Sequence, residues 1–347
     1  MNLPENPSNI LIIKPSSLGD VVSAIPVLRS LKRKFPTAKF TWLIAKSCLD
    51  IIDADPDLDE IIIFDRKKIG KAWFSFSAAK ELFSLKHKLA SRNFDLVIDI
   101  QGLLRSAMFA KWTKSPIKIG FSNAREGAPL FYNIKHKTTE IHTVDRNCEI
   151  AKLLGAEILP TDMKLAVHPD ADKFAHDILS KNAIDPRKYI VCVPPTRWAT
   201  KLYPTRHWRK VVEALSQKMP IILLGSPAKF EVDLCKSVAD GQPNRVLTLA
   251  GKTSLKQLVA IISNAAGVIC SDSAAQFIAP ATKTPCLSLI GPTSLERTGP
   301  FWGLGEAVVA DVPCQGCLKK RCDHISCMQS IQPSEVIARA SKLFNLE

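Results

Sequence analysis

Short apolar runs alternate with longer amphipathic segments along the chain, in two successive series. Apolar runs of four to eight residues between polar residues are typical of buried strands, and apolar positions spaced three or four apart are typical of helices. In the first series, the pattern predicts strands at 10–14, 39–44, 60–64, 95–99 and 117–121, and helices near 21–35, 46–53, 77–92, 103–113 and 142–155.

A second series follows a seam at 156–170, which holds two prolines and little periodicity. There a helix runs to about Lys181, and the alternation then predicts strands at 189–193, 220–224, 246–249, 267–270 and 285–289, with helices at 206–217, 227–239, 254–264 and 333–344. Strands that alternate with helices indicate parallel sheets and an α/β fold. We therefore predict two similar α/β domains that meet at a cleft, at 1–167 and 168–330, and a segment 331–347 whose helix could cross back to the first domain.

Composition and length fit a globular protein of two domains. The chain has 347 residues, of which 46% are hydrophobic and 23% charged, and these shares are ordinary for soluble proteins. No apolar run reaches the ~18 residues of a membrane span. The first nine residues lack the apolar core of a secretory signal. We expect a cytoplasmic protein.

The formal net charge of +14 indicates an anionic partner. Basic proteins bind nucleic acids, anionic lipid headgroups or phosphorylated substrates. No zinc-finger, RNA-recognition or helix-turn-helix signature accompanies the basic residues, so we do not expect a nucleic-acid partner. The charge favours an anionic substrate or a membrane surface.

The loop after the first predicted strand carries the most distinctive polar group. Ser16, Ser17 and Gly19 lead into Asp20, which begins an amphipathic segment. Loops at the carboxyl ends of parallel strands hold functional groups in such folds. A positioned carboxylate beside a glycine suits a general base acting on a hydroxyl. The alternative is that Asp20 only caps the helix.

Ten cysteines without a secretory signal do not predict a disulfide framework. Six are scattered among apolar residues and fit a protein core. The other four, with the spacing C-x2-C-x4-C-x4-C, are Cys314, Cys317, Cys322 and Cys327. Four thiolates this close could enclose one structural zinc or iron ion; the alternative is four reduced thiols.

Several motifs occur in order over residues 10–293: KPSSLGDVVSAIPVLRSLK, DLVIDIQGLLRSA, GFSNAREG, HTVDR, KLYP and GKTSLKQLVAIISNAAGVICSDS. Together they resemble the lipopolysaccharide heptosyltransferases of glycosyltransferase family 9, most closely the heptosyltransferase I group. The resemblance implies a GT-B fold, with two Rossmann-like domains whose parallel sheets face each other across the active-site cleft.

The resemblance also implies an activity. This is the inverting transfer of L-glycero-D-manno-heptose from ADP-heptose to Kdo-lipid A, without a catalytic metal or other cofactor, in the biosynthesis of the lipopolysaccharide inner core. Such an enzyme would work on the cytoplasmic face of the inner membrane, in peripheral contact with it. Cysteine-rich tails occur in some relatives, and one in the protein-glycosylating branch binds iron.

The family's catalytic aspartate matches Asp20, with Ser17 and Gly19 shaping the loop on the acceptor side. Lys201 matches the lysine that binds the donor phosphate, where a fixed cation would stabilise the charge on the leaving ADP. Thr196 and Arg197 lie where they could assist it.

The donor motif Asp-[Thr/Ser]-Gly-x-x-His is matched only in part. Asp272 and Ser273 start it, at a strand–loop–helix turn whose backbone amides could bind phosphate. Ala274 then replaces the glycine and Phe277 the histidine, and this leaves the donor sugar open. Glu231 is the acidic residue near the position that binds ribose in the family.

Cations in the first domain match the acceptor site of the family. Arg105 and Arg125 are expected to bind anionic groups of the acceptor, since arginine pairs with carboxylates and phosphates through two parallel hydrogen bonds. A basic acceptor loop is matched by Arg66, Lys67, Lys68 and Lys71, unless these residues form only a solvated turn. Trp73, Phe74 and Phe76 follow directly, and basic residues beside aromatic ones suit contact with lipid headgroups.

Two other functions stay open. The chain could be a family-9 transferase that uses another nucleotide sugar or another acceptor. It could also be a basic binding protein without chemistry, although the presence of both Asp20 and Lys201 argues against a degenerate enzyme.

Overall fold

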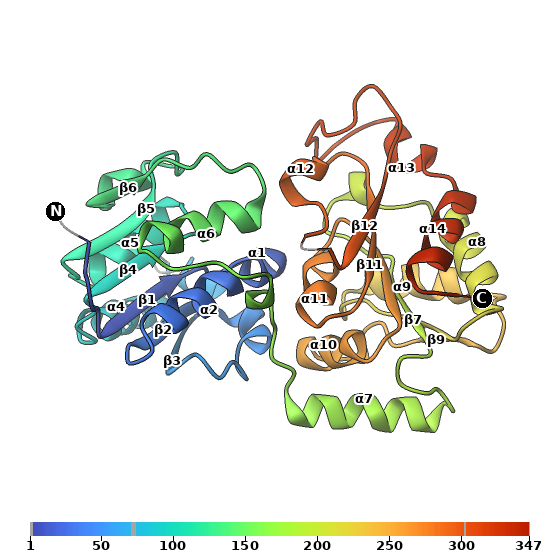
Figure 1. Ribbon diagram of the computed structural model, residues 1–347, viewed down its shortest axis with the longest axis horizontal. Coiled ribbons are helices and arrows are strands. Elements are labelled where there is room, and N and C mark those ends of the chain that lie inside the picture. The colour runs from blue at the N-terminus through green and yellow to red at the C-terminus, as the bar shows by residue number, and fades with distance from the viewer. Residues whose placement is uncertain (1–2, 71–73, 302, 347) are drawn as a thin grey trace. The chain divides into compact units, whose positions relative to one another are not determined.

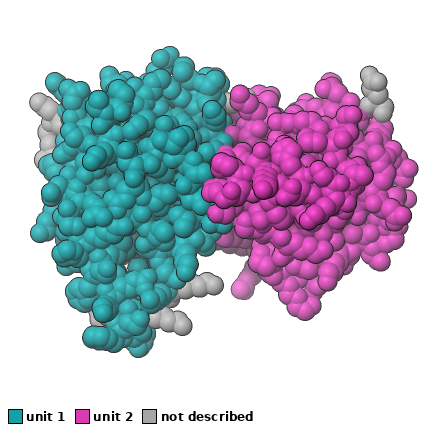
Figure 2. All heavy atoms as spheres, turned by 90° about the horizontal axis from the view of Figure 1, so that it is seen from below, with its two compact units in different colours: residues 1–166 teal, residues 167–347 magenta. Residues whose placement is uncertain are grey.

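The computed structural model describes residues 3–70, 74–301 and 303–346. Two compact units divide the chain, Met1–Ala166 and Val167–Glu347, which Figure 2 shows in separate colours. Each unit is an α/β fold built on one six-stranded parallel sheet. No helix among the described residues is long and apolar enough to cross a bilayer.

The sheet of unit 1 has the order β3-β2-β1-β4-β5-β6 (Figure 1). Its strands are β1 (Asn9–Ile13), β2 (Lys39–Ala45), β3 (Glu60–Phe64), β4 (Leu96–Asp99), β5 (Ile117–Phe121) and β6 (Ile134–His136). The central strands are covered on both faces, which is why they read as unbroken apolar runs. Five of the six were predicted. β6 was not, because three residues with a lysine and a histidine carry no strand pattern.

The helices of unit 1 are α1 (Leu18–Val22), α2 (Ile25–Lys34), α3 (Arg66–Ile69), α4 (Phe76–Ala90), α5 (Leu104–Trp112) and α6 (Thr143–Leu153), with 3-10 turns η1 (Lys46–Ile51), η2 (Ala128–Phe131) and η3 (Pro160–Asp162). One expectation was wrong: residues 21–35 form two helices rather than one. Pro26 lies in the first turn of α2, where its missing N–H is tolerated, whereas inside a continuous helix it would break a hydrogen bond. Residues 46–51 form a 3-10 helix where an α-helix was expected.

Unit 2 has the sheet order β12-β11-β10-β7-β8-β9. Its strands are β7 (Ile190–Val193), β8 (Ile221–Leu223), β9 (Val246–Thr248), β10 (Gly267–Ser271), β11 (Cys286–Ile290) and β12 (Gly305–Val309). The helices are α7 (Pro169–Lys181), α8 (Thr205–Ser216), α9 (Lys229–Ala239), α10 (Leu255–Ser263), α11 (Ala275–Ala281), α12 (Leu295–Thr298), α13 (Ser326–Ser330) and α14 (Pro333–Leu343), with the 3-10 turn η4 (Ala199–Lys201). The edge strand β12 was not predicted.

The last helix belongs to unit 2. α14 packs against α8 and touches β11 and β12. Its apolar residues Val336 and Ala340 join a core that includes Trp208 of α8. The sequence analysis allowed for a crossing to the first domain; the structure places α14 within the second unit instead.

Both sheets share one topology. In each unit the first and fourth strands are neighbours, β1 beside β4 and β7 beside β10. The order of the strands reverses at that point, and ligands of open α/β sheets bind beyond the carboxyl ends of the strands there. The loops after these four strands are therefore the first places to look for a site.

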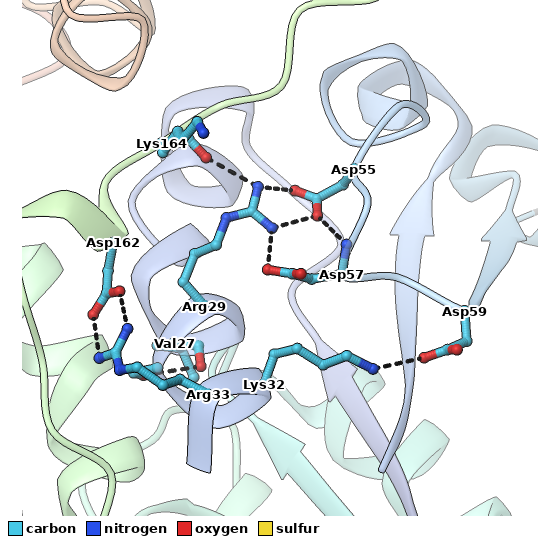
Figure 3. A network of polar contacts seen from close by, with 10 residues as sticks. Val27, Arg29, Lys32, Arg33, Asp55, Asp57, Asp59, Asp162 and Lys164 are labelled. Atoms are coloured by element: carbon cyan, nitrogen blue, oxygen red, sulfur yellow. Dashed lines mark hydrogen bonds and ion pairs between the residues drawn. The ribbon is translucent and has the colours of Figure 1, made fainter. Parts of the chain in front are cut away.

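Three basic residues of α2 form ion pairs with aspartates of neighbouring loops in unit 1: Arg29, Lys32, which pairs with Asp59, and Arg33 (Figure 3). Arg29 binds both carboxylate oxygens of Asp55 at 2.6 and 2.7 Å and one oxygen of Asp57 at 2.5 Å. It also donates to the carbonyl of Lys164 at 3.1 Å. Arg33 pairs with Asp162 at 2.5 Å. The side chain of Asp55 is 1% exposed, so its charge depends on Arg29 for compensation.

We predict that Arg29→Met destabilises the protein by about 3 kcal/mol, because a buried carboxylate that loses its partner costs about 3–5 kcal/mol. Arg92→Met is the matched control: Arg92 pairs with Glu60 at 2.8 Å at the surface, where such pairs contribute less than about 1 kcal/mol. Urea unfolding of both variants, compared by transition midpoint, tests this. Equal shifts would contradict the prediction.

Candidate active site

Asp20 is fixed by the residue that precedes its helix. It is the third residue of α1, and its Oδ2 accepts hydrogen bonds from the backbone N–H of Ser17 at 2.9 Å and from the Ser17 hydroxyl at 2.6 Å. Asp20 therefore does cap the helix, as the simpler interpretation had it. The same bonds hold the carboxylate in one place at the carboxyl end of β1, which a general base also needs.

A second helix locks α1 in position. The Ser23 hydroxyl donates to the carbonyl of Asp20 at 2.9 Å. The amide of Asn147, on α6, donates to the Ser23 carbonyl and hydroxyl, both at 3.2 Å. Asn147 is 3% exposed. The sequence analysis missed this residue, because a contact between residues 124 positions apart leaves no local pattern.

A buried lysine lies behind Asp20. Lys14 directly follows β1, is 6% exposed and donates from Nζ to the carbonyl of Ile100 at 2.9 Å. Burial lowers the pKa of Lys14, while the nearby carboxylates of Asp20 and Asp99 attract its charge. Lys14 thus places a hydrogen-bond donor between the carboxyl ends of β1 and β4. The sequence analysis did not single it out.

Asp99, at the end of β4, is fully buried but well supplied with donors. It accepts from the hydroxyl of Tyr132 at 2.6 Å and from the backbone N–H of Gln101 at 2.9 Å. Burial raises the pKa of Asp99, and these hydrogen bonds oppose that rise. Gly120 leaves the room that the ring of Tyr132 occupies. Asp99 is therefore a fixed part of the floor of the site.

A pocket of about 130 Å³ opens beside this floor. Arg66 and Arg105 both line it, so the structure brings together two predicted acceptor residues that lie 39 positions apart. Its other lining residues are Pro15, Ser16, Phe64, Gln101, Leu103, Ser106, Phe109 and Glu126. Arg125 is exposed and does not line the pocket, although its backbone N–H binds the carbonyl of Gly102 at 3.0 Å.

The remaining residues of the basic loop stay predictions. Lys68 is exposed and forms an ion pair with Glu81 of α4. Lys71 and Trp73 lie outside the described residues, and so does the side chain of Lys67. Neither Ser17 nor Gly19 lines the pocket; Ser17 acts on Asp20 instead.

In unit 2, the loops after β7 and β10 meet through an ion pair. Lys201 Nζ lies 2.8 Å from Asp272 Oδ2, and the two side chains are 15% and 8% exposed. The other carboxylate oxygen of Asp272 accepts from the amide of Gln276, on α11, at 2.5 Å. Two residues that the sequence analysis chose are thereby brought together over 71 positions. Gln276 was missed, although it lies four residues after Asp272 in the sequence.

Trp198 forms the wall of this arrangement. Lys201 Nζ lies 4.4 Å from the centre of the indole ring, and Lys320 Nζ lies 5.0 Å from it. The hydroxyl of Thr196 donates to the carbonyl of Trp198 at 2.8 Å and so shapes the loop. Arg197 is exposed. Two cations therefore gather near one indole ring, at the carboxyl end of β7.

Buried hydroxyls without partners flank Asp272 and follow the neighbouring strand β11. Among the described residues, the side-chain oxygens of Ser271, Ser273 and Thr293 have no hydrogen-bond partner. Buried polar groups are normally paired, so these oxygens mark a place where a polar ligand could bind. Thr293 follows β11 and was not predicted.

The two departures from the donor motif have different outcomes. Ala274 has φ −60°, a conformation open to any residue, so the missing glycine causes no strain there. Phe277 is buried, with 7% of its surface exposed. Glu231, in the first turn of α9, accepts from the backbone N–H of Ser226 at 2.7 Å. This contact gives Glu231 a structural role, which is the alternative to ribose binding.

The sequence profile of glycosyltransferase family 9 (heptosyltransferase) matches residues 82–326, which is more than half of the chain. The chain belongs to this family. The two parallel sheets are those of its GT-B fold.

Relatives within the family include several types of heptosyltransferase. Lipopolysaccharide heptosyltransferase 1 of Escherichia coli strain K12 is 29% identical over 289 residues, which are 82% of this chain and 88% of the relative. Lipopolysaccharide heptosyltransferase 3 of the same strain is 28% identical over 79% of this chain and 80% of the relative. The structure of E. coli heptosyltransferase WaaC with ADP-2-deoxy-2-fluoro heptose matches with a TM-score of 0.78 and 26% identity, over 96% of this chain and 99% of that one.

The predicted cysteine metal site receives no support in this family-9 chain. Among the described residues, no group of three or more His, Cys, Asp or Glu side chains is placed to hold a metal ion. Cys314 and Cys317 are exposed and Cys322 is half-buried, whereas Cys327 is buried in the core beside Met328. Close spacing brings the four residues into one loop, but Cys327 points into the core from α13.

This loop instead covers the site around Lys201. The backbone N–H of Leu318 donates to the carbonyl of Pro292 at 2.7 Å, and the Thr200 hydroxyl donates to the carbonyl of Lys319 at 2.9 Å. These bonds bring Lys320 to Trp198. The loop is thus a structural neighbour of the candidate donor site, and no step of chemistry is assigned to its thiols.

We predict that iodoacetamide at pH 8 modifies Cys314 and Cys317 within minutes, and Cys148 and Cys235 only on unfolding. Burial raises the pKa of both Cys148 and Cys235 to about 12, and only the thiolate reacts. Mass spectrometry of digests, before and after denaturation, measures this. The prediction would be contradicted if all four loop cysteines were protected from iodoacetamide and a chelator abolished that protection. Such a result would support the metal site.

Proposed function

We propose that the chain transfers a heptose residue from ADP-heptose to Kdo-lipid A, with inversion at the anomeric carbon and without a catalytic metal. Membership of family 9 supports heptose transfer, and the relatives with this activity include types 1 and 3. The assignment to the first heptose rests on the match to type 1 relatives. One observation supports the mechanism: each unit holds a charged group in a fixed position. These groups are Asp20 in unit 1 and Lys201, paired with Asp272, in unit 2.

Asp20 acts as the general base. A hydroxyl of the acceptor attacks the anomeric carbon of the heptose while its proton passes to the carboxylate of Asp20. The bond between that carbon and the β-phosphate oxygen breaks, and ADP leaves with the electron pair. A single in-line displacement inverts the anomeric centre. The two hydrogen bonds from Ser17 keep one carboxylate oxygen in place, and the other oxygen is available for the proton.

Lys201 stabilises the leaving ADP. Negative charge grows on the β-phosphate as the bond breaks, and a fixed ammonium beside it lowers the barrier. Asp272 holds Lys201 before the donor binds, and the unpaired hydroxyls of Ser273 and Thr293 are donors for phosphate oxygens. The donor of this chain is inferred in part from WaaC, whose structure contains an ADP-heptose analogue.

The pocket of unit 1 binds the anionic acceptor. Arg66 and Arg105 line it, and guanidinium groups pair with carboxylates and phosphates in two-bond geometry. The acceptor is linked to a lipid, so the reaction takes place at a membrane surface. We place it on the cytoplasmic face of the inner membrane.

We predict that Asp20→Asn lowers acceptor-dependent ADP release from ADP-heptose by about 10²–10⁴-fold, the range for a general base, while ADP-heptose still binds. Asp170→Asn, whose side chain is 92% exposed on α7, is the control and keeps full activity. If the wild type binds ADP-heptose but releases no ADP with Kdo-lipid A, the acceptor is a different one. Absence of ADP-heptose binding would refute the donor and point to another nucleotide sugar.

Lys201→Met is expected to lower kcat by about 10²–10³-fold, as the loss of one group that stabilises the transition state does, with a smaller rise in the KM for ADP-heptose. Lys188→Met, an exposed lysine of unit 2, keeps both parameters. We expect the wild-type rate to be the same with and without excess EDTA. A rate that falls with EDTA and returns with Mg²⁺ would contradict the assignment of this role to Lys201.

A further inference from the structure

Exposed phenylalanines gather at the start of α4 and along one face of it. Phe74 is 93% exposed, Phe76 90% and Phe83 68%. Phe76 and Phe83 lie two helical turns apart, so both project from the same side of α4. The other side carries Leu85 and Leu89, which pack in the core of unit 1. The helix thus has an ordinary core face and a second, exposed face that is also apolar.

The same stretch holds almost all of the excess charge of unit 1. Residues 1–166 have 25 Lys and Arg against 18 Asp and Glu, and residues 65–92 have eight against two. The rest of the unit is nearly neutral, with 17 against 16. Positive charge and exposed aromatic surface therefore coincide on one short part of the chain.

Two of these lysines have no ion-pair partner among the described residues. Three other basic residues are paired: Lys68 with Glu81, and both Lys88 and Arg92 with Glu60. Among the described residues, Lys80 and Lys86 of α4 have no ion-pair partner, and both are exposed. Lys80 lies between the two phenylalanines of the exposed face, four residues after Phe76 and three before Phe83.

We propose that Phe74, Phe76 and Phe83, with Lys80 and Lys86, form a docking surface for an anionic phospholipid bilayer. Aromatic rings of an interfacial helix enter the boundary between headgroups and acyl chains, and the ammonium groups bind lipid phosphates. A second copy of this chain is a poor occupant, because it would bring like charges together. The inference rests on the proposed function, whose acceptor is lipid-linked, and goes beyond it by assigning the surface.

The docking surface adjoins the acceptor pocket. Arg66 lines that pocket and begins α3, and α3 packs against α4. A bilayer bound at α4 therefore lies next to the pocket. A headgroup sugar could reach Arg66 and Arg105 while its acyl chains stay in the membrane.

Co-sedimentation of the full chain with lipid vesicles tests the docking surface. We expect the wild type to bind phosphatidylcholine vesicles that contain phosphatidylglycerol, and we expect added salt to weaken this binding. The variant F74S/F76S/F83S binds these vesicles at least tenfold more weakly, and so does K80S/K86S. Phe230→Ser, which removes a phenylalanine that is 52% exposed on α9, is the matched control and binds as the wild type does.

A triple variant that still sediments with anionic vesicles like the wild type would overturn the inference. The inference would also be overturned if the wild type did not bind vesicles and instead bound single-stranded oligonucleotides through the same phenylalanines, since aromatic and basic residues also bind nucleic acids. ADP release with a short-chain, water-soluble acceptor separates this inference from the proposed function. We expect the triple variant to match the wild type on that acceptor and to be slower on acceptor embedded in vesicles. Vesicle binding that depends on the phenylalanines, without ADP release on any acceptor, would refute the function and keep the docking surface.

Discussion

Parallel pairing of the first and fourth strands of each unit is the constraint on which both candidate sites depend. In unit 1, Ile13 aligns with Asp99, so Lys14 comes directly beside Ile100 and donates to its carbonyl. In unit 2, Cys270 aligns with Val193, which brings the loops of Asp272 and Lys201 into contact. A slip of one residue would turn every side chain of a strand to the other face. The apolar runs of these central strands, buried on both sides, therefore fix the positions of polar groups that lie beyond their ends.

The two sites hold their charged groups in different ways. Asp20 is fixed by Ser17, three residues away, so a single turn of helix positions this carboxylate. Lys201 is fixed by Asp272 from a distant part of the chain, and it retains hydrogen-bonding capacity because an ammonium has three donors. In the proposed mechanism, a donor phosphate can thus bind Lys201 without breaking the bond of Lys201 to Asp272. Trp198 and Gln276 limit the movement of the pair.

Local signals made much of the fold and part of the site predictable. Strand periodicity located ten of the twelve strands among the described residues, and β6 and β12 were missed at the sheet edges, where the apolar pattern is weak. Asp20, Lys201 and Asp272 could be chosen as candidates because each stands in a short motif that resembles one of the family. Lys14, Asn147, Gln276 and Thr293 were missed, since their importance comes from contacts that exist only after the strands pair. The cysteine spacing shows that four thiols are close in sequence, but not that Cys327 of α13 is buried in the core, and the structural metal ion receives no support among the described residues.

The departures from the donor motif can be understood from the contacts of α11. A histidine at the position of Phe277 could offer a polar group to the site, but here that position is held by an apolar ring that is 7% exposed. The neighbouring Gln276 donates to Asp272 from the same short helix. Ala274 adopts a helical φ, so the backbone that follows Asp272 keeps its course without glycine. The substitutions therefore alter the surroundings of the Lys201–Asp272 pair and leave the pair itself intact. In the proposed mechanism, a change of donor sugar would act on those surroundings, whereas the charge of Lys201 toward the leaving phosphate would stay the same.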